Sequence, residues 1–96
     1  DIDLPLGKIR IVQNRGSAGH KGVESIIKEL KTKKFIRIRI GIQPKSGKPK
    51  NPEKFVIENF SKEEEKIIKE VIKKTAKAVE ILISEGLEKT MSQYNK

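Results

Sequence analysis

The sequence predicts an α/β protein, because segments with the two-residue period of strands alternate with segments that have the period of helices. Two short stretches, Lys8–Val12 and Phe35–Ile42, alternate in this way. A long stretch that begins at Ser61 instead repeats its apolar residues every three or four positions. The length of 96 residues suits one small domain or part of a larger one.

The composition excludes several classes of function. The chain has no cysteine and a single histidine, which rules out a disulfide framework and thiol catalysis. For the same reason we expect no metal site and no cofactor. No apolar run approaches the roughly 18–20 residues that span a bilayer, and no signal-peptide pattern is present at the start. We therefore expect a cytoplasmic protein without a membrane partner.

The net charge of +9 is unevenly distributed. Residues 8–54 hold 14 Lys or Arg against 3 acidic residues, whereas residues 55–96 hold 8 of each sign. A basic half beside a neutral half indicates one surface that faces a polyanion. The alternative is that lysines simply cover every exposed surface of a lysine-rich protein.

The first strand and the first helix follow from residue patterns in the N-terminal third. Lys8–Val12 places Ile9 and Ile11 on one face, as a strand with one apolar side requires. Gln13–Gly19 has the composition of a turn or loop. A helix is predicted from Gly22 to Leu30, with one apolar stripe formed by Val23, Ile26, Ile27 and Leu30.

The second strand, Phe35–Ile42, is the clearest one. Its isoleucines share one face, while Arg37 and Arg39 share the other. The strand–helix–strand order predicts two parallel strands joined by a right-handed crossover. Pro44–Pro52 is predicted to be an irregular surface loop, and Phe55–Ile57 a short extended stretch.

A long helix starts after Ser61, where Ser61 and Glu64 have the spacing of a capping box. Gly86 is predicted to end it, and Leu87–Tyr94 to form a last short helix. Two short strands and one short helix cannot cover its apolar stripe, so either structure is missing or the chain associates with something. The expected buried stripe consists of Ile68, Ile72, Thr75, Val79 and Leu82, widened by Ile67, Val71, Ala76, Ala78 and Ile83.

The glycine-rich run Gly16–Gly22 lies between a predicted strand and a predicted helix. Backbone N–H groups at a helix start can bind a phosphate or a carbonyl oxygen. The run matches neither a P-loop nor a dinucleotide fingerprint, and a flexible connection is the alternative. His20 lies within it and could shuttle a proton. We favour a histidine that shapes the turn through a backbone hydrogen bond, because no neighbouring carboxylate or nucleophile completes a triad.

Three of the four arginines fall on the two predicted strands, in a chain that otherwise uses 18 lysines. Arg37 and Arg39 project from the same face, and Arg10 joins them if the strands are neighbours. Guanidinium groups on a sheet face match the geometry of phosphate oxygens. The alternative is that these arginines pair with acidic groups from a missing part of the fold.

In this order, the motifs resemble those of bacterial peptidyl-tRNA hydrolases, and the resemblance covers essentially the whole chain. It departs from the family pattern in two places: Lys21 stands where the family has asparagine, and one glycine of a doublet is absent. The matching segments are Asp3-Leu4-Pro5-Leu6-Gly7, Gly16-Ser17-Ala18-Gly19-His20-Lys21-Gly22, Phe35-Ile36-Arg37-Ile38-Arg39-Ile40-Gly41-Ile42 and Ser84-Glu85-Gly86-Leu87-Glu88-Lys89-Thr90-Met91.

The resemblance implies part of a three-layer α/β/α sandwich with a mixed sheet, ending in a long amphipathic helix and a short C-terminal helix. Residues 1–96 would be the C-terminal portion of a single domain. The implied activity is hydrolysis of the ester between a peptide and the tRNA 3′ end. The family's histidine base and its orienting aspartate would lie upstream of Asp1. We therefore expect no catalytic residue in this chain and no activity from it alone.

The resemblance also implies partners, namely the acceptor end of a peptidyl-tRNA and the missing N-terminal half. Because Lys21 replaces an amide, a noncatalytic RNA-binding module on the same fold stays open as an alternative. A cation binds phosphate but cannot act as both donor and acceptor. The phosphate-binding role carries over to Arg39. The residues expected to bind tRNA are Arg10, Gly19, His20, Lys21, Gly22, Arg37 and Arg39.

Overall fold

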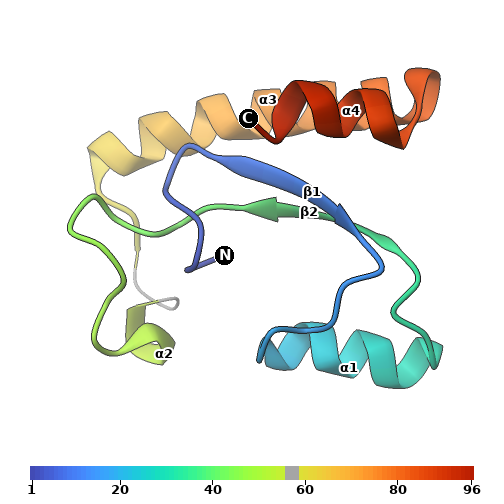
Figure 1. Ribbon diagram of the computed structural model, residues 1–96. Coiled ribbons are helices and arrows are strands. Elements are labelled where there is room, and N and C mark those ends of the chain that lie inside the picture. The colour runs from blue at the N-terminus through green and yellow to red at the C-terminus, as the bar shows by residue number, and fades with distance from the viewer. Residues whose placement is uncertain (56–58) are drawn as a thin grey trace.

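The computed structural model describes residues 1–55 and 59–96. Within them the fold is mixed α/β, as predicted, with two strands and four helices. Figure 1 shows the strands side by side, with α3 and α4 on one side and α1 on the other. In chain order the elements are β1 (Ile9–Gln13), α1 (Lys21–Leu30), β2 (Ile36–Ile40), α2 (Pro52–Phe55), α3 (Lys62–Glu85) and α4 (Leu87–Tyr94).

The two strands are antiparallel, so the predicted parallel pair with a right-handed crossover is wrong. A crossover would carry the chain back to the end of the sheet where β1 begins. Here the chain turns directly after β1, where Asn14, Ala18 and Gly19 have positive φ. The loop runs back along the strands, and α1 then returns the chain to the end at which β1 stops (Figure 1). β2 therefore starts beside the end of β1 and runs in the opposite direction.

The register sorts isoleucines and arginines onto opposite faces of the sheet, because side chains alternate along each strand. This confirms the predicted faces of both strands. We call the two sides the isoleucine face and the arginine face. The cross-strand pairs are Ile9–Ile40, Ile11–Ile38 and Gln13–Ile36 on the isoleucine face, and Arg10–Arg39 and Val12–Arg37 on the arginine face.

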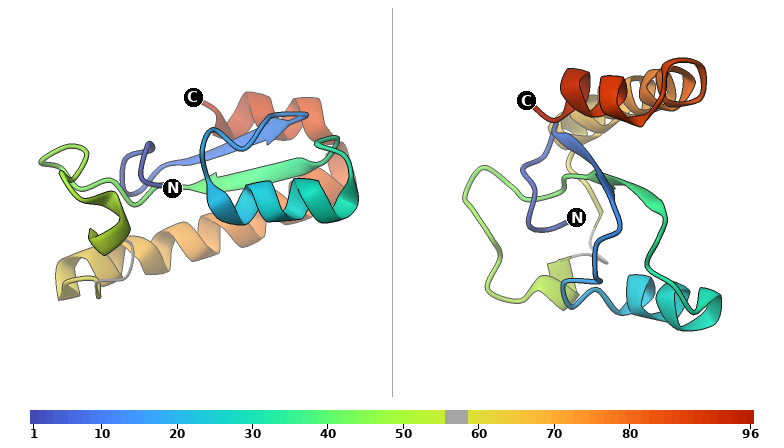
Figure 2. Two further views of the ribbon diagram at one scale, coloured as in Figure 1. Left: turned by 90° about the horizontal axis from the view of Figure 1, so that it is seen from below. Right: turned by 45° about the vertical axis from the view of Figure 1, so that its right-hand side comes forward.

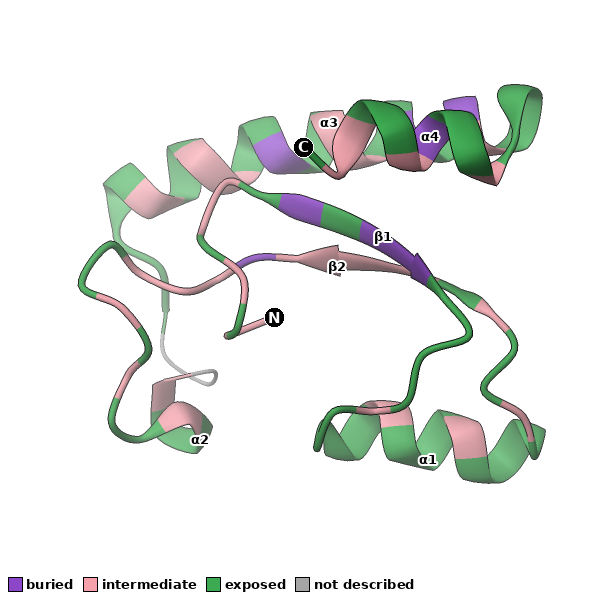
Figure 3. Cartoon of the chain, viewed as in Figure 1, coloured by how far each residue is buried: buried purple, intermediate pink, exposed green. Residues whose placement is uncertain are grey.

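The core lies between the isoleucine face and helices α3 and α4. Ile11 has no exposed surface, and Ile9 has only 3%. Figure 3 shows the buried residues concentrated in β1, α3 and α4. Burial of apolar surface, at about 25 cal/mol per Å², is what holds these elements together. The cluster consists of Ile9, Ile11, Val71 and Ala78, against which Ile38, Ile40, Ile67, Leu87, Met91 and Tyr94 pack.

The residue after α4 closes the outer edge of β1. The Asn95 side-chain oxygen accepts a hydrogen bond from the Ile11 N–H at 2.7 Å, and its side-chain nitrogen donates to the Ile11 carbonyl at 2.8 Å. Backbone groups on an edge strand otherwise stay open to pairing with another chain. One side chain thus satisfies both groups and fixes the end of α4 against β1.

Helix α3 begins and ends where the sequence predicts. Ser61 Oγ accepts a hydrogen bond from the Glu64 N–H at 3.2 Å, and the Glu64 carboxylate accepts one from the Ser61 N–H at 2.8 Å. This reciprocal pair is the predicted capping box. At the other end Gly86 has a φ of 92°, and its N–H donates to the Leu82 carbonyl. The chain then folds back, so that α4 lies along α3 (Figures 1 and 2).

The buried face of α3 differs from the predicted stripe. Its buried residues are Val71, Ala78 and Ile81. Adjacent residues on a helix point about 100° apart, so the helix is turned by roughly one residue from the expected orientation. The sheet and α4 cover only one side of a wider apolar arc. Three residues of the predicted set form an exposed stripe on α3, namely Ile72 (59% exposed), Val79 (39%) and Ile83 (81%).

Helices lie on both sides of the sheet, but the core cluster lies on the isoleucine face, and Val12 is the one buried strand residue on the arginine face. Figure 2 shows α1 on the side opposite to α3 and α4. No residue of α1 is buried, although its four apolar residues form the predicted stripe. The described residues therefore establish mixed α/β architecture, while the three-layer sandwich with a larger mixed sheet stays a prediction.

The region around α2 was expected to be irregular and then extended. The chain has no regular element from Pro44 to Asn51, in agreement with a surface loop. Pro52 starts the short helix α2 instead of ending the loop, and Phe55 closes that helix. Phe55 is therefore not extended. The rest of that prediction, Val56 and Ile57, lies outside the described residues.

Candidate nucleic-acid interface

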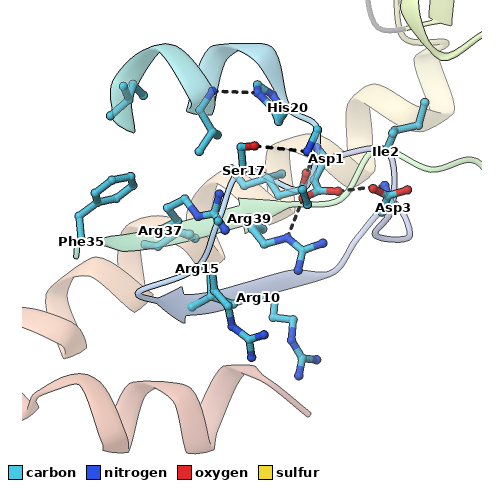
Figure 4. A pocket seen from close by; sticks show the side chains of 18 of the residues that line it. Asp1, Ile2, Asp3, Arg10, Arg15, Ser17, His20, Phe35, Arg37 and Arg39 are labelled. Atoms are coloured by element: carbon cyan, nitrogen blue, oxygen red, sulfur yellow. Dashed lines mark hydrogen bonds and ion pairs between the residues drawn. The ribbon is translucent and has the colours of Figure 1, made fainter. Parts of the chain in front are cut away.

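A cleft of about 1140 Å³ lies on the arginine face of the sheet. Both strands, the glycine-rich loop, the start of α1 and the N-terminal segment contribute to its walls. Figure 4 shows these parts of the chain converging on the labelled arginines. Among the lining residues are Arg10, Arg15, Gly19, His20, Arg37 and Arg39.

The predicted gathering of three arginines on one face is confirmed. Arg10 lies directly opposite Arg39 in the ladder, and Arg37 is two residues away on the same side of β2. Like charges that face each other across strands repel, which is destabilising. An anion in the cleft would relieve this repulsion. Among the described residues, an ion pair is found for Arg39 but none for Arg10 or Arg37.

The ion pair joins Arg39 to Asp1. Arg39 Nε donates to Asp1 Oδ2 at 2.6 Å, and both side chains are about two-thirds to three-quarters buried, with 31% and 25% exposed. The second carboxylate oxygen, Oδ1, accepts the Asp3 N–H at 2.9 Å. Figure 4 draws both contacts as dashed lines.

The N-terminal segment reaches Arg39 because it pairs with the chain beyond β2. The Gln43 N–H donates to the Leu4 carbonyl at 3.0 Å, as part of a parallel bridge between Pro5 and Gln43. Gly41 lies at the closest approach, where an added Cβ would be 2.0 Å from the Pro5 carbonyl oxygen. The described residues thus contain both antiparallel and parallel pairing. The close contact between the N-terminal segment and the chain beyond β2, which places Asp1 beside Arg39, requires glycine at position 41.

His20 caps helix α1. Its Nδ1 accepts a hydrogen bond from the Val23 N–H at 3.1 Å, and its own backbone is extended. This contact is the turn-shaping role favoured over a proton shuttle. An added Cβ at Gly22 would lie 2.9 Å from His20 Cε1, so glycine there leaves room for the ring. Gly19, with a φ of 84°, turns the chain into the cap.

Lys21 is exposed at the first position of α1, next to the His20 cap. It is therefore near the cleft, although it is not one of the residues that line it. Lys48, from the loop before α2, does line the cleft, and its Nζ lies 3.0 Å from Asp3 Oδ1.

Sequence reasoning missed two residues of this site, Asp1 and Arg15. Asp1 contacts a side chain 38 positions away, and no local pattern signals such a pair. Arg15 lies in the loop after β1 and lines the cleft. The preference for arginine at the site, in a chain otherwise rich in lysine, was the one signal that pointed to it.

Across residues 1–55 and 59–96, no helix combines the length and the low polarity needed to cross a membrane. Within the same residues, no three His, Cys, Asp or Glu side chains come together as metal ligands.

Comparison with known proteins identifies the family. The family model for peptidyl-tRNA hydrolase matches residues 1–96. The chain belongs to the peptidyl-tRNA hydrolase family. Peptidyl-tRNA hydrolase from Aquifex aeolicus is 46% identical over 99 residues, which cover 100% of this chain and 50% of that protein. The protein of that name from Pseudothermotoga lettingae is 44% identical over 97 residues, covering 99% of this chain and 50% of the relative. The chain thus spans about half the length of these curated relatives.

The family assignment confirms the resemblance drawn from the sequence motifs. Three of the motif segments that carry the resemblance meet at the cleft: the N-terminal segment, the glycine-rich loop and β2. The fourth, Ser84–Met91, forms the junction of α3 and α4 on the opposite side of the sheet. Residues far apart in the sequence therefore build one basic surface.

Proposed function

We propose that this chain binds the acceptor end of peptidyl-tRNA as one half of a peptidyl-tRNA hydrolase, which cleaves the ester between peptide and tRNA. The observation that carries the proposal is the antiparallel register, which puts Arg10, Arg37 and Arg39 on one face beside an open cleft. Guanidinium groups offer forked donors to phosphate oxygens, and a cationic surface attracts a polyanion over long distances. A role on tRNA would also place the protein in the cytoplasm.

Ester cleavage needs a positioned base to activate water. In this chain the single histidine uses Nδ1 to cap α1, which leaves it poorly placed for that task. Following the resemblance, we propose that the histidine base, its aspartate and the asparagines that hold the peptide come from the N-terminal half. The 96 residues alone would then bind tRNA without cleaving it.

Two exposed surfaces of this chain are consistent with binding by an N-terminal half. The exposed stripe of α3 (Ile72, Val79 and Ile83) lies within an arc of about 40° on one side of the helix, and contiguous apolar surface of this kind usually marks an interface. The backbone groups of Ile36 and Ile38 point away from β1 and have no hydrogen-bond partner among the described residues. Such an edge accepts a further strand. We propose that the N-terminal half covers both, completing the three-layer sandwich and the mixed sheet.

The binding proposal is tested by titrating tRNA into the chain at several salt concentrations. Arg39→Ala should weaken binding and lower the slope of log K against log salt by about 0.7–0.9, the contribution of one phosphate contact. Lys77→Ala is the matched control, since it removes the same charge from an exposed position on α3. Equal effects of the two substitutions would show that tRNA binds through nonspecific charge alone, and would contradict the proposal. Absence of salt-dependent binding would favour a protein-interaction domain instead.

The enzymatic proposal is tested by mixing the chain with the unmatched half of the Aquifex aeolicus relative and measuring ester cleavage of peptidyl-tRNA. We expect no cleavage by either part and recovery on mixing. Ile83→Lys should leave the isolated chain folded, because Ile83 is 81% exposed, and should still block recovery. Glu80→Lys is the control on the polar side of α3 and should not. Efficient cleavage by the 96 residues alone would contradict the division of roles.

A noncatalytic RNA-binding module is the second candidate, and Lys21 is the observation that favours it. An ammonium group at the start of α1 binds phosphate but cannot replace both hydrogen-bonding groups of an amide. If this candidate holds, mixing restores no cleavage while tRNA binding persists. Lys21→Asn would then raise cleavage in the mixed system only if the amide is the missing group.

A further inference from the structure

The contacts of Asp1 and Arg39 are divided in a way that leaves one side of the guanidinium free. Asp1 uses both carboxylate oxygens, one for the Asp3 N–H and one for Arg39 Nε. A guanidinium has five N–H donors, of which the Nε–H is only one. The four donors on the two terminal nitrogens of Arg39 are not used in any hydrogen bond among the described residues, and Arg39 lines the cleft.

Asp1 is itself held in place, so it can act as a fixed support. Its Oδ1 contact with the Asp3 N–H closes a local turn, and the Ile42 N–H donates to the Asp1 carbonyl at 2.9 Å. The close approach at Gly41 fixes this segment against the chain beyond β2. A long side chain such as arginine loses rotamer freedom when it binds, and a support that pre-orders it removes part of that cost before the ligand arrives.

We propose that Asp1 is a positioning residue, which holds the Arg39 guanidinium through Nε so that its terminal N–H groups present a fixed pair of donors to one phosphate of tRNA. The inference rests on the proposed tRNA-binding function and adds a role that sequence reasoning did not assign. Arg10, directly opposite in the ladder, has no such support among the described residues. It acts as a general cation of the same face.

The direction of the change in tRNA affinity caused by Asp1→Asn distinguishes a positioning role from an effect of charge alone. Asp1→Asn keeps the shape and the Oδ1 acceptor but removes a negative charge from a surface that binds an anion. If Asp1 contributed charge alone, this substitution would tighten tRNA binding. If Asp1 positions Arg39, binding weakens in spite of the added positive charge. Asp3→Asn is the matched control, because Asp3 carries the same charge two residues away and pairs with Lys48 instead of Arg39.

The experiment measures tRNA affinity of the chain and its variants across a salt series. We expect Asp1→Asn to weaken tRNA binding roughly three- to tenfold, because tRNA must then order the Arg39 side chain without the support of Asp1. Its slope of log K against log salt should also fall by about 0.7–0.9, one phosphate contact, and Asp3→Asn should show neither change. In an Arg39→Ala background, Asp1→Asn should cause no further loss. Asp1→Glu should recover part of the affinity, because it restores the carboxylate.

The outcomes distinguish this inference from the function on which it rests. If Arg39→Ala weakens binding while Asp1→Asn matches Asp3→Asn, the positioning role is overturned and the tRNA-binding function stands. If Arg39→Ala has no effect, both fail. Should Asp1→Asn not fold, Asp1→Glu gives the decisive measurement, because it keeps the charge and moves the carboxylate by one methylene group. Binding weaker than that of the wild type, with no further loss in an Arg39→Ala background, supports the role, and wild-type affinity overturns it.

Discussion

Val71 and Ile72 are adjacent aliphatic residues of α3 with opposite environments, and replacing each with alanine tests how the helix packs. Val71 is 3% exposed and belongs to the core cluster, whereas Ile72 is 59% exposed. The stripe predicted from the sequence places Ile72 at its centre and Val71 at its margin. The two orientations of the helix therefore predict opposite orders of stability loss.

The expected loss of stability for each substitution follows from how far the side chain is buried. Val71→Ala removes two carbon groups at about 0.8 kcal/mol each, and the cavity left behind raises the loss to roughly 2–3 kcal/mol. Ile72→Ala removes three, but more than half of that side chain is already in water. The remaining cost of about 1 kcal/mol is reduced by a few tenths because alanine favours a helix more than isoleucine does.

Thermal unfolding followed by circular dichroism measures both losses. For a domain of this size 1 kcal/mol corresponds to about 4–8 °C, so Val71→Ala should lower Tm by roughly 8–24 °C and Ile72→Ala by less than about 6 °C. The absence of cysteine allows a second measurement, since Ile72→Cys should react with a thiol reagent much faster than Val71→Cys. Equal losses, or faster labelling at position 71, would refute the packing described for α3. In the mixed system with the other half, the cost of Ile72→Ala should rise.

Three further substitutions test contacts that hold the N-terminal segment, β1 and α1 in place. Gly41→Ala should unfold the chain or displace its N-terminal segment, because the new Cβ meets the Pro5 carbonyl oxygen; a wild-type Tm would contradict the close approach. Asn95→Ala should lower stability by roughly 1–3 kcal/mol, since it strips two hydrogen bonds from Ile11, and amide exchange at Ile11 should accelerate; unchanged exchange would argue against edge closure. His20→Ala should cost about 1 kcal/mol of helix stability, and an unchanged Tm would contradict the cap; a loss of tRNA binding beyond that expected from the lost stability would support direct contact of the ring with tRNA.

Local signals in the sequence located most elements. The capping box of Ser61 and Glu64, the glycine after α3 and the alternation of isoleucine with arginine in β2 each involve residues within a few positions of one another. Such signals lie next to the backbone geometry that they favour and can be recognised without knowledge of the rest of the fold, and these predictions were confirmed. The arginine face was also foreseen, with Arg10 joining Arg37 and Arg39 on the condition that the strands were neighbours.

Strand direction and helix rotation needed the tertiary structure. The sequence between β1 and β2 fits a crossover equally well, and three positive φ values after β1 turn the chain the other way. The apolar arc of α3 is wider than the sheet and α4 can cover, so periodicity alone does not decide which part of it is buried. Val71 rather than Ile72 faces the core because the position of β1 and α4 selects it.

The sequence by itself determined the family, the two strands and every helix except α2, and the basic character of one half of the chain. Tertiary structure alone decided that β2 runs antiparallel to β1, that Asp1 holds Arg39 across 38 residues and that Asn95 closes β1 across 84. The physical reason is how far apart in the sequence the contacting residues lie. Hydrogen bonds and side-chain pairs within one turn or one strand leave a periodic trace in the sequence, whereas contacts between distant segments depend on where the whole chain places them and leave none.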